Sequence, residues 1–259
     1  MSDAGLSLRQ LRYENRAFWR NPASAFFTFA FPLMFLVIFN LIFGGGTTDR
    51  FCGGKELSLS TFYIPSVAAF AVVTACYTNI SISTVFSRDE GVLKRVRGTP
   101  LPGWAYLLAR IAHAILIALL LVVIVVLFGR VFYSVDIPTT TLPAFVASLA
   151  VGAACFSALG LAVTRIVPNP DAAPAVINAT VLPLLFISDV FIPLENAPDW
   201  LNTFSGIFPI KPFSHALIGA YNPCAVGSGF DGSDLIVMGI WTVAGVVLAA
   251  RFFSWEPRT

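Results

Sequence analysis

The residues of this sequence that could take part in catalysis or bind a metal or nucleotide are two histidines, four cysteines and one glycine-lysine pair. A phosphate-binding loop needs a glycine five positions before its Gly-Lys pair and a serine or threonine after it. Gly54-Lys55 has Asp49 and Glu56 at those positions, so no nucleotide-binding motif is present. His113 and His215 lack serine or aspartate partners at helical spacing, and no Cys/His spacing indicates a metal site. The sequence therefore predicts neither an intramembrane hydrolase nor a chain that holds its own nucleotide or metal.

The four cysteines form two groups. Cys76 and Cys155 fall in long apolar runs, where packing is their expected role. Cys52 and Cys224 fall in loops that we expect on the outer, oxidising side, where a disulfide would tie the first loop to the last. Two free thiols are the alternative, because a sequence contains no distance between the two residues.

A compact charged segment, RDEGVLKRVRGTPLPGWAYLLAR at 88–110, interrupts the apolar chain. Within it, Asp89 and Glu90 stand before Lys94, Arg95 and Arg97, a polarity that suits the dipole of a short helix. Gly98-Thr99-Pro100 would end that helix before the next apolar run begins. We predict a short helix within 88–103, held between two spans so that a partner gripping it would move both. An ordinary positively charged loop is the alternative.

The elements around this segment are predicted by composition. The chain of 259 residues is 57% hydrophobic and only 12% charged, whereas soluble domains carry about 25% charged residues. Its continuous apolar runs match helices of roughly 20 residues, not the alternating segments of a membrane barrel. We therefore expect one all-α integral membrane domain over 1–259. Its six transmembrane helices are predicted at 23–43, 62–86, 104–128, 142–167, 172–192 and 235–253.

Basic residues predict how this domain is oriented. With six spans both termini share one side, and that side collects 12 of the 16 lysines and arginines. We therefore expect both termini and the 88–103 segment to be cytoplasmic. A net charge of +2 is too small to indicate a nucleic-acid partner.

Two further segments are expected to lie at the membrane boundaries. Residues 6–21 place Leu8, Leu11, Phe18 and Trp19 on one arc and arginines on the next, which predicts a helix along the cytoplasmic surface. Residues 193–223 are apolar but interrupted by prolines and polar residues. That pattern favours a re-entrant pair of short helices at the outer side over a loop resting on the headgroups.

Polar residues inside the predicted spans are candidates for a substrate path, because each is costly in lipid. Asn79, Ser83 and Phe86 can share one helix face, and Asn178 lies in the fifth span. Hydrogen bonding between helices is the alternative role. Asp189 lies near the outer end of the fifth span, where it would attract a cationic substrate, cap a helix or meet water.

Two motifs resemble those of ABC-2 type permeases, the membrane subunits of type-2 ABC exporters, in particular the daunorubicin-resistance-like drug and antibiotic branch. The pattern E-x-G-T-L-E/K-R-L-x-x-T-P-L is matched at Glu90, Gly91, Leu93, Arg95, Thr99, Pro100 and Leu101, with Val92 replacing the usual threonine. The pattern F-P-L-E-x-x-P-x-W-L is matched at Pro193, Leu194, Glu195, Pro198, Trp200 and Leu201. Asp189 stands where a small residue, often glycine, is usual. The resemblance covers nearly the whole chain.

This resemblance implies a permease that pairs with itself or a paralogue and docks two copies of an ATPase subunit on its cytoplasmic face. The coupling helix would contain Glu90, Gly91, Leu93, Arg95, Thr99 and Pro100, whereas Asp189, Glu195 and Trp200 would act in the re-entrant or gating region. ATP and Mg would bind the partner, with no cofactor on this chain. ATP binding would drive an amphipathic drug, antibiotic or lipid-like compound outward across a prokaryotic cytoplasmic membrane.

Two alternatives stay open at this point. A polysaccharide or glycolipid ABC exporter permease would share the motifs and usually has aromatic stripes facing its channel. An ATP-independent channel or secondary transporter would be expected to carry internal repeats or paired charges within its spans. The sequence has no visible repeat, and charge inside its spans is nearly absent.

Overall fold

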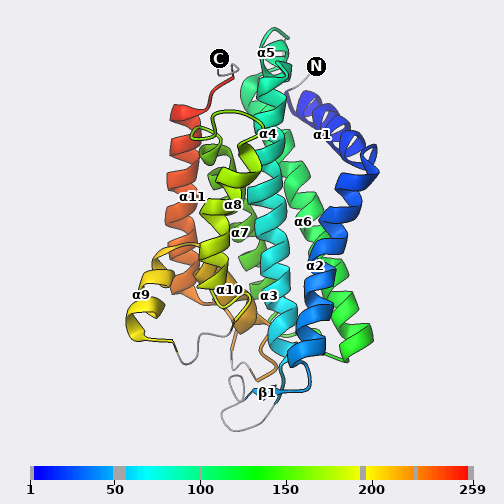
Figure 1. Ribbon diagram of the computed structural model, residues 1–259, viewed down its shortest axis with the longest axis vertical. Coiled ribbons are helices and arrows are strands. Elements are labelled where there is room, and N and C mark those ends of the chain that lie inside the picture. The colour runs from blue at the N-terminus through cyan, green and yellow to red at the C-terminus, as the bar shows by residue number, and fades with distance from the viewer. Residues whose placement is uncertain (1–2, 49–56, 100, 193–196, 225–226, 256–259) are drawn as a thin grey trace.

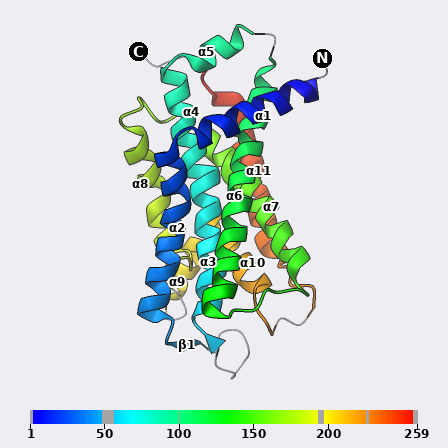
Figure 2. The same cartoon turned by 90° about the vertical axis from the view of Figure 1, so that its right-hand side faces the viewer.

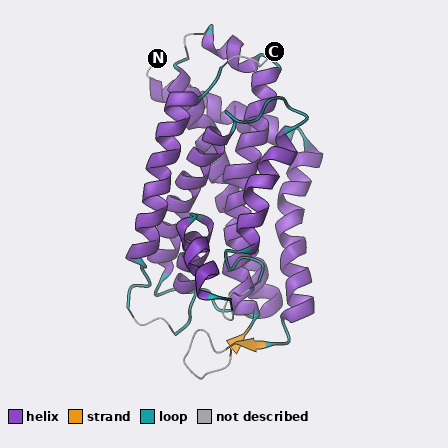
Figure 3. Cartoon of the chain, turned by 60° about the vertical axis from the view of Figure 1, so that its left-hand side comes forward, coloured by secondary structure: helices purple, strands orange, loops and turns teal. Residues whose placement is uncertain are grey.

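The computed structural model describes residues 3–48, 57–99, 101–192, 197–224 and 227–255. Helices form nearly all of this part of the chain (Figure 3). In chain order they are α1 (Asp3–Trp19), α2 (Pro22–Phe43), α3 (Ser60–Val73), the π-helix η1 (Thr74–Asn79), α4 (Ile80–Asp89), α5 (Val92–Arg97), α6 (Gly103–Tyr133), α7 (Leu142–Val163), α8 (Ala173–Phe186), α9 (Asp199–Ile207), α10 (Ile210–Ala220) and α11 (Gly232–Phe252). One antiparallel pair joins β1 (Thr47–Thr48) to β2 (Leu57–Ser58).

Within the described residues, five helices are long and apolar enough to cross a bilayer. They are α2, the continuous rod α3–η1–α4 from Ser60 to Asp89, α6, α7 and α11. These helices run along the long axis of the molecule and form one bundle (Figure 1). The chain is therefore a multi-pass, all-helical membrane protein.

The predicted span at 172–192 is shorter in the structure. α8 has 14 residues, about 21 Å at 1.5 Å per residue, whereas a bilayer core is about 30 Å thick. The helix contains Pro183 and ends at Phe186. The chain then turns, with Asp189 at a φ of 57°. The described part of the chain thus contains five long apolar helices and the shorter α8, where the sequence predicted six of full length.

The core lies around α3, where every residue is buried. By contrast, Met238 and Gly245 are the buried residues of α11, and much of its apolar surface, including Ile236, Ile240 and Val243, is exposed. A helix that is apolar on all sides is stable at the centre of a bundle, and an exposed apolar face suits contact with lipid. The arrangement matches a helical membrane protein with a central α3 and a peripheral α11.

Small residues on α7 allow close helix packing beside the π-helix. A Cβ added at Gly160 would lie 2.5 Å from Ile80 Cγ2 and 3.0 Å from the Cys76 carbonyl oxygen. Ser81 Oγ donates a 2.7 Å hydrogen bond to the Gly160 carbonyl at the same contact. Small residues and serine hydroxyls are the usual means of bringing membrane helices together. This contact fixes the depth of the α3–η1–α4 rod against α7.

The two ends of the bundle differ in content. Both chain termini and α5 lie at one end (Figure 1), which we call the basic end because α1, α5 and the adjoining ends of α4, α7 and α11 carry most of the arginines. α1 runs across this end (Figure 2) and packs on α6 through pairs such as Phe18 and His113, whose ring centroids are 5.5 Å apart. The opposite end contains α9, α10 and the β1–β2 pair.

Candidate functional site

The α4–α5–α6 corner at the basic end contains the first predicted motif. Gly91 separates α4 from α5 with a φ of 70°, in the left-handed region that glycine adopts without strain. Leu93 is fully buried and anchors α5 to the bundle. Glu90, Arg95 and Thr99 are exposed, and Pro100 lies outside the described residues. The structure therefore presents a short, rigidly attached helix with charged groups facing outward.

Arg88 ties this corner to α7. Its side chain is only 3% exposed, and its guanidinium donates to the carbonyl oxygens of Thr164 at 3.0 Å and Val167 at 2.9 Å. These carbonyls lie just beyond the last turn of α7, where backbone acceptors lack helical partners and a positive charge is favourable. Arg88 thereby joins the end of α4 to the segment that follows α7.

Arg110 makes the corresponding tie between α6 and α4. It is 5% exposed and donates to the Tyr106 hydroxyl at 2.6 Å and to Ser87 Oγ at 3.1 Å. Sequence reasoning counted Arg88 and Arg110 only as positive charge on one side of the membrane. Their burial could have been predicted, because each arginine stands within a helical turn of an apolar run, where its charge needs hydrogen-bond partners.

A cavity of about 400 Å³ lies between α1, the η1–α4 segment and α6. We call it the α1 cavity. Asn79, Ser83 and Phe86 all line it, so the shared face predicted for these three residues exists. Their neighbours there include Glu14, Asn21, Arg110 and His113. Asn178 lies on α8 and does not line this cavity.

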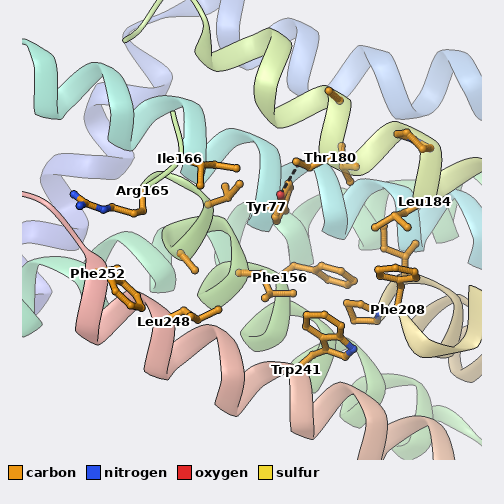
Figure 4. Close-up of a pocket in the computed structure, with 18 residues that line it drawn as sticks. Tyr77, Phe156, Arg165, Ile166, Thr180, Leu184, Phe208, Trp241, Leu248 and Phe252 are labelled. Atoms are coloured by element: carbon orange, nitrogen blue, oxygen red, sulfur yellow. Dashed lines mark hydrogen bonds between the residues drawn. The ribbon is translucent and has the colours of Figure 1, made fainter. Parts of the chain in front are cut away.

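A second, more apolar hollow lies between α8 and α11, with α7 as its floor, and measures about 820 Å³. We call it the α8–α11 groove. Figure 4 shows Arg165 and Phe252 at one end and Phe208 with Trp241 toward the other. Inside it, the Tyr77 hydroxyl and Thr180 Oγ1 are hydrogen-bonded at 2.7 Å. Sequence reasoning missed this groove because its lining comes from five helices, η1, α7, α8, α10 and α11, that are far apart in the chain.

Of the residues predicted at the opposite end, the structure describes Asp189, Trp200 and Cys224. Asp189 is 3% exposed, and its left-handed backbone explains why a small residue, often glycine, suits this position. Trp200 is 68% exposed on α9. Glu195 and Cys52 lie outside the described residues. Cys76 and Cys155 are free and buried. Cys224 is disulfide-bonded, and the pairing of Cys224 with Cys52 stays a prediction.

One polar cluster at the opposite end was not predicted. His215 Nδ1 lies 2.6 Å from Asp234 Oδ2, and both lie near Asp231, which caps the start of α11 by accepting from the Ser233 and Asp234 amides. Ligand atoms of the three residues are within 4.8 Å of one another. The Ser233 hydroxyl, followed by the two backbone amides, holds the pKa of Asp231 below its ordinary value. The cluster ties α10 to α11, and its capping bonds already use one carboxylate oxygen of Asp231.

Comparison with known proteins adds an independent finding. The family model described as "ABC-2 type transporter" matches residues 9–221. A probable multidrug ABC transporter permease, YbhR of Escherichia coli, is 23% identical over 159 residues, 61% of this chain and 43% of YbhR. The daunorubicin resistance ABC transporter permease DrrB1 of Streptomyces coeruleorubidus is 29% identical over 194 residues, 71% of this chain and 62% of DrrB1. The putative transport permease ycf38 of Cyanophora paradoxa is 28% identical over 184 residues, 69% of this chain and 61% of ycf38. The matches thus span less than two thirds of these relatives.

Proposed function

The chain belongs to the ABC-2 type transporter family, and we propose that it is the permease subunit of an ATP-driven exporter that moves an amphipathic small molecule outward. The α4–α5–α6 corner carries the proposal. It combines a buried anchor, Leu93, with exposed charges at Glu90 and Arg95. A partner that grips α5 would pull on α4 and α6 directly, and on α7 through Arg88.

The proposed partner at this corner is an ABC ATPase, present in two copies and carrying ATP and Mg. The permeases named in the comparisons are described as parts of ABC transporters, which supports an ATPase elsewhere in the assembly. A second permease copy, identical or a paralogue, completes the proposed transporter. This chain is a translocation subunit in that scheme, with hydrolysis assigned to the partner.

The proposed topology places the basic end in the cytoplasm of a prokaryotic cell, because arginines concentrate on that side of membrane proteins. α1 then lies along the cytoplasmic surface of the membrane. α8, extended by the turn after Phe186, completes a sixth crossing, and α9 with α10 forms a re-entrant hairpin at the outer side. Burial of most of α10, including Phe213 and Leu217, supports a hairpin held inside the bundle.

The proposed entrance for substrate is the α1 cavity, where Asn79, Ser83 and Phe86 combine polar and aromatic groups. Such a lining suits an amphipathic compound, since polar groups give orientation and apolar walls give most of the binding energy. Daunorubicin is a reasonable first trial, because DrrB1 is named for resistance to it. Ser83→Phe, which fills the cavity, should lower efflux of such a compound, whereas Ser233→Phe at the opposite end should not.

A polysaccharide exporter is the alternative that shares the motifs. Two of the phenylalanines on α2 that could form the expected aromatic stripe pack against another ring. Phe35 and Phe39 lie 5.5 and 5.8 Å from Phe191, measured between ring centroids. Neither phenylalanine lines the α1 cavity or the α8–α11 groove. The described geometry therefore favours a small-molecule substrate.

The decisive experiment is to co-purify the chain with its genetically neighbouring ATPase and measure ATP hydrolysis and transport. Glu90→Ala and Arg95→Ala should weaken the complex or uncouple hydrolysis from transport, because both side chains are exposed on the docking corner. Arg12→Ala, which removes an exposed arginine from α1, is the matched control and should leave coupling unchanged. If no ATPase associates and both corner variants transport normally, the exporter assignment fails.

A further inference from the structure

A pocket of about 470 Å³ at the basic end lies next to the α8–α11 groove. Arg97, Arg165 and Arg251 line it, together with the segment from Phe252 to Trp255. The three arginines come from three places in the chain: the last turn of α5, the segment after α7 and the last turn of α11. Only the tertiary structure brings these charges around one pocket.

The arginine pocket and the apolar groove are continuous. Arg165 and Phe252 line both of them. Beyond these two residues the groove wall is formed by side chains such as Leu159, Leu184 and Leu248, and Trp241 lies farther along α11. A ligand occupying both would therefore need a negatively charged head and a long apolar tail.

The length of the groove matches one leaflet of a bilayer. Trp241 and Phe252 are 11 residues apart on α11, which corresponds to about 16 Å of helix at 1.5 Å per residue. Half of a hydrocarbon core about 30 Å thick is about 15 Å. The groove thus extends from the membrane boundary at the basic end to the middle of the membrane.

We propose that this pocket and groove together bind an anionic phospholipid, with its phosphate among Arg165, Arg251 and Arg97 and an acyl chain lying between α8 and α11. Basic pockets between membrane helices are suited to anionic headgroups. The groove is partly open, so a lipid can enter from the bilayer without crossing the bundle. The site is separate from the α1 cavity and does not depend on the identity of the exported compound.

Arg97 links the proposed lipid site to α5. Arg97 belongs to α5, the helix proposed above to dock the ATPase, so the headgroup would also touch that element. This consequence rests on the proposed function, whereas lipid binding does not. Binding is therefore measured on the purified permease chain alone.

The test uses quenching of tryptophan fluorescence in the full chain, in detergent micelles, by phospholipids with brominated acyl chains. The Trp241 signal, which reports on the groove, is the part of the quenching that the parent chain shows and Trp241→Phe does not. Brominated phosphatidylglycerol should produce this signal at a lower mole fraction than brominated phosphatidylcholine. Equal quenching by the two lipids would overturn the proposal, because the arginines would then contribute no selectivity.

Charge substitutions identify the headgroup site. Arg165→Gln and Arg251→Gln should each lower the affinity for phosphatidylglycerol about fivefold. This factor corresponds to the attraction of about 1 kcal/mol between one arginine and an anionic lipid surface. The matched control is Arg12→Gln with Arg16→Gln, two exposed arginines on α1. If the control lowers affinity as much as the pocket variants, the effect is diffuse charge and the proposal fails.

A third variant identifies the tail site and separates a lipid from a soluble anion. Ala179→Phe should fill the groove and abolish the Trp241 signal while leaving the unfolding temperature unchanged. Ala175→Phe, one turn away on α8 and outside the lining, should retain the signal. Inorganic phosphate should not displace the brominated lipid. Displacement by phosphate would assign the arginines to a soluble anion, and a normal signal in Ala179→Phe would place the acyl chain outside the groove. Either result would overturn the proposal.

Discussion

The two ends of the bundle hold their charged side chains in different ways. At the basic end, Arg88 and Arg110 are 3% and 5% exposed. Arg88 donates to the Thr164 carbonyl just beyond α7, and Arg110 donates to Ser87 on α4. At the opposite end, Arg130 pairs with Asp136 and His215 pairs with Asp234, and the side chains of Arg130 and His215 are 51% and 53% exposed. Buried charges lose much more when a partner is removed than exposed ones do. The two buried arginines therefore hold helix positions fixed at the basic end, whereas the pairs made by Arg130 and His215 are weaker restraints.

The largest expected effect is that of Arg88→Gln. The shorter side chain cannot reach both carbonyls at the end of α7, so two hydrogen bonds from a charged donor are lost, at a cost of about 3 kcal/mol. Denaturant titration of the purified chain in detergent measures this loss. Arg130→Gln is the matched substitution at the opposite end and should cost less than about 1 kcal/mol. Equal losses for the two variants would remove the contrast between the ends.

Tyr106→Phe should have the next largest effect. It removes the hydroxyl that accepts from Arg110 at 2.6 Å, at an expected cost of about 1.5 kcal/mol for a bond with a charged partner. Tyr133→Phe, in the last turn of α6 at the other end, should be close to neutral. Thermal unfolding of both variants measures the two losses of stability. The comparison is well matched because both tyrosines lie on α6 and each substitution removes one hydroxyl group.

Gly91→Ala tests the backbone of the corner. Alanine at a φ of 70° should cost about 1 kcal/mol, because the left-handed region is unfavourable for residues with a Cβ. Gly98→Ala is the control, since Gly98 has a φ of −81° and alanine adopts that conformation freely. A stability loss as large at Gly98 would mean that the strain argument is wrong.

The smallest effect concerns pH at the opposite end. The lowered pKa of Asp231 means that its carboxylate stabilises the fold. This contribution is fully present above the ordinary carboxyl pKa of about 4 and is lost as the pH falls through the lower value of the folded state. Asp231→Asn keeps an N-cap, so near neutral pH the change should be a few tenths of a kcal/mol. Below pH ~4 the variant and the parent should converge; a constant difference down to acidic pH would contradict this assignment.

The sequence predicted the class of fold well because hydrophobicity is a local property. Continuous apolar runs require helices in lipid, and the long apolar helices α2, α6, α7 and α11 lie close to four of the predicted ranges. The short helix that ends near Gly98 was also predicted from the local pattern of charges. The left-handed turn at Gly91 was not, and it leaves Asp89 at the end of α4 and not at the front of α5. The fifth run was the exception, since composition alone did not reveal that α8 would stop at Phe186.

By itself, then, the sequence determined that this chain crosses a membrane, which side is basic and which short segment stands out for docking, because these follow from composition and spacing along the chain. Only the tertiary structure decided that Arg88 binds the end of α7 and that Asn79, Ser83 and Phe86 share a cavity with α1. It also decided that arginines from α5, from the segment after α7 and from α11 line one pocket beside an apolar groove. Each of these contacts joins residues far apart in the chain. Helix packing sets which distant faces meet, and no local pattern encodes that choice.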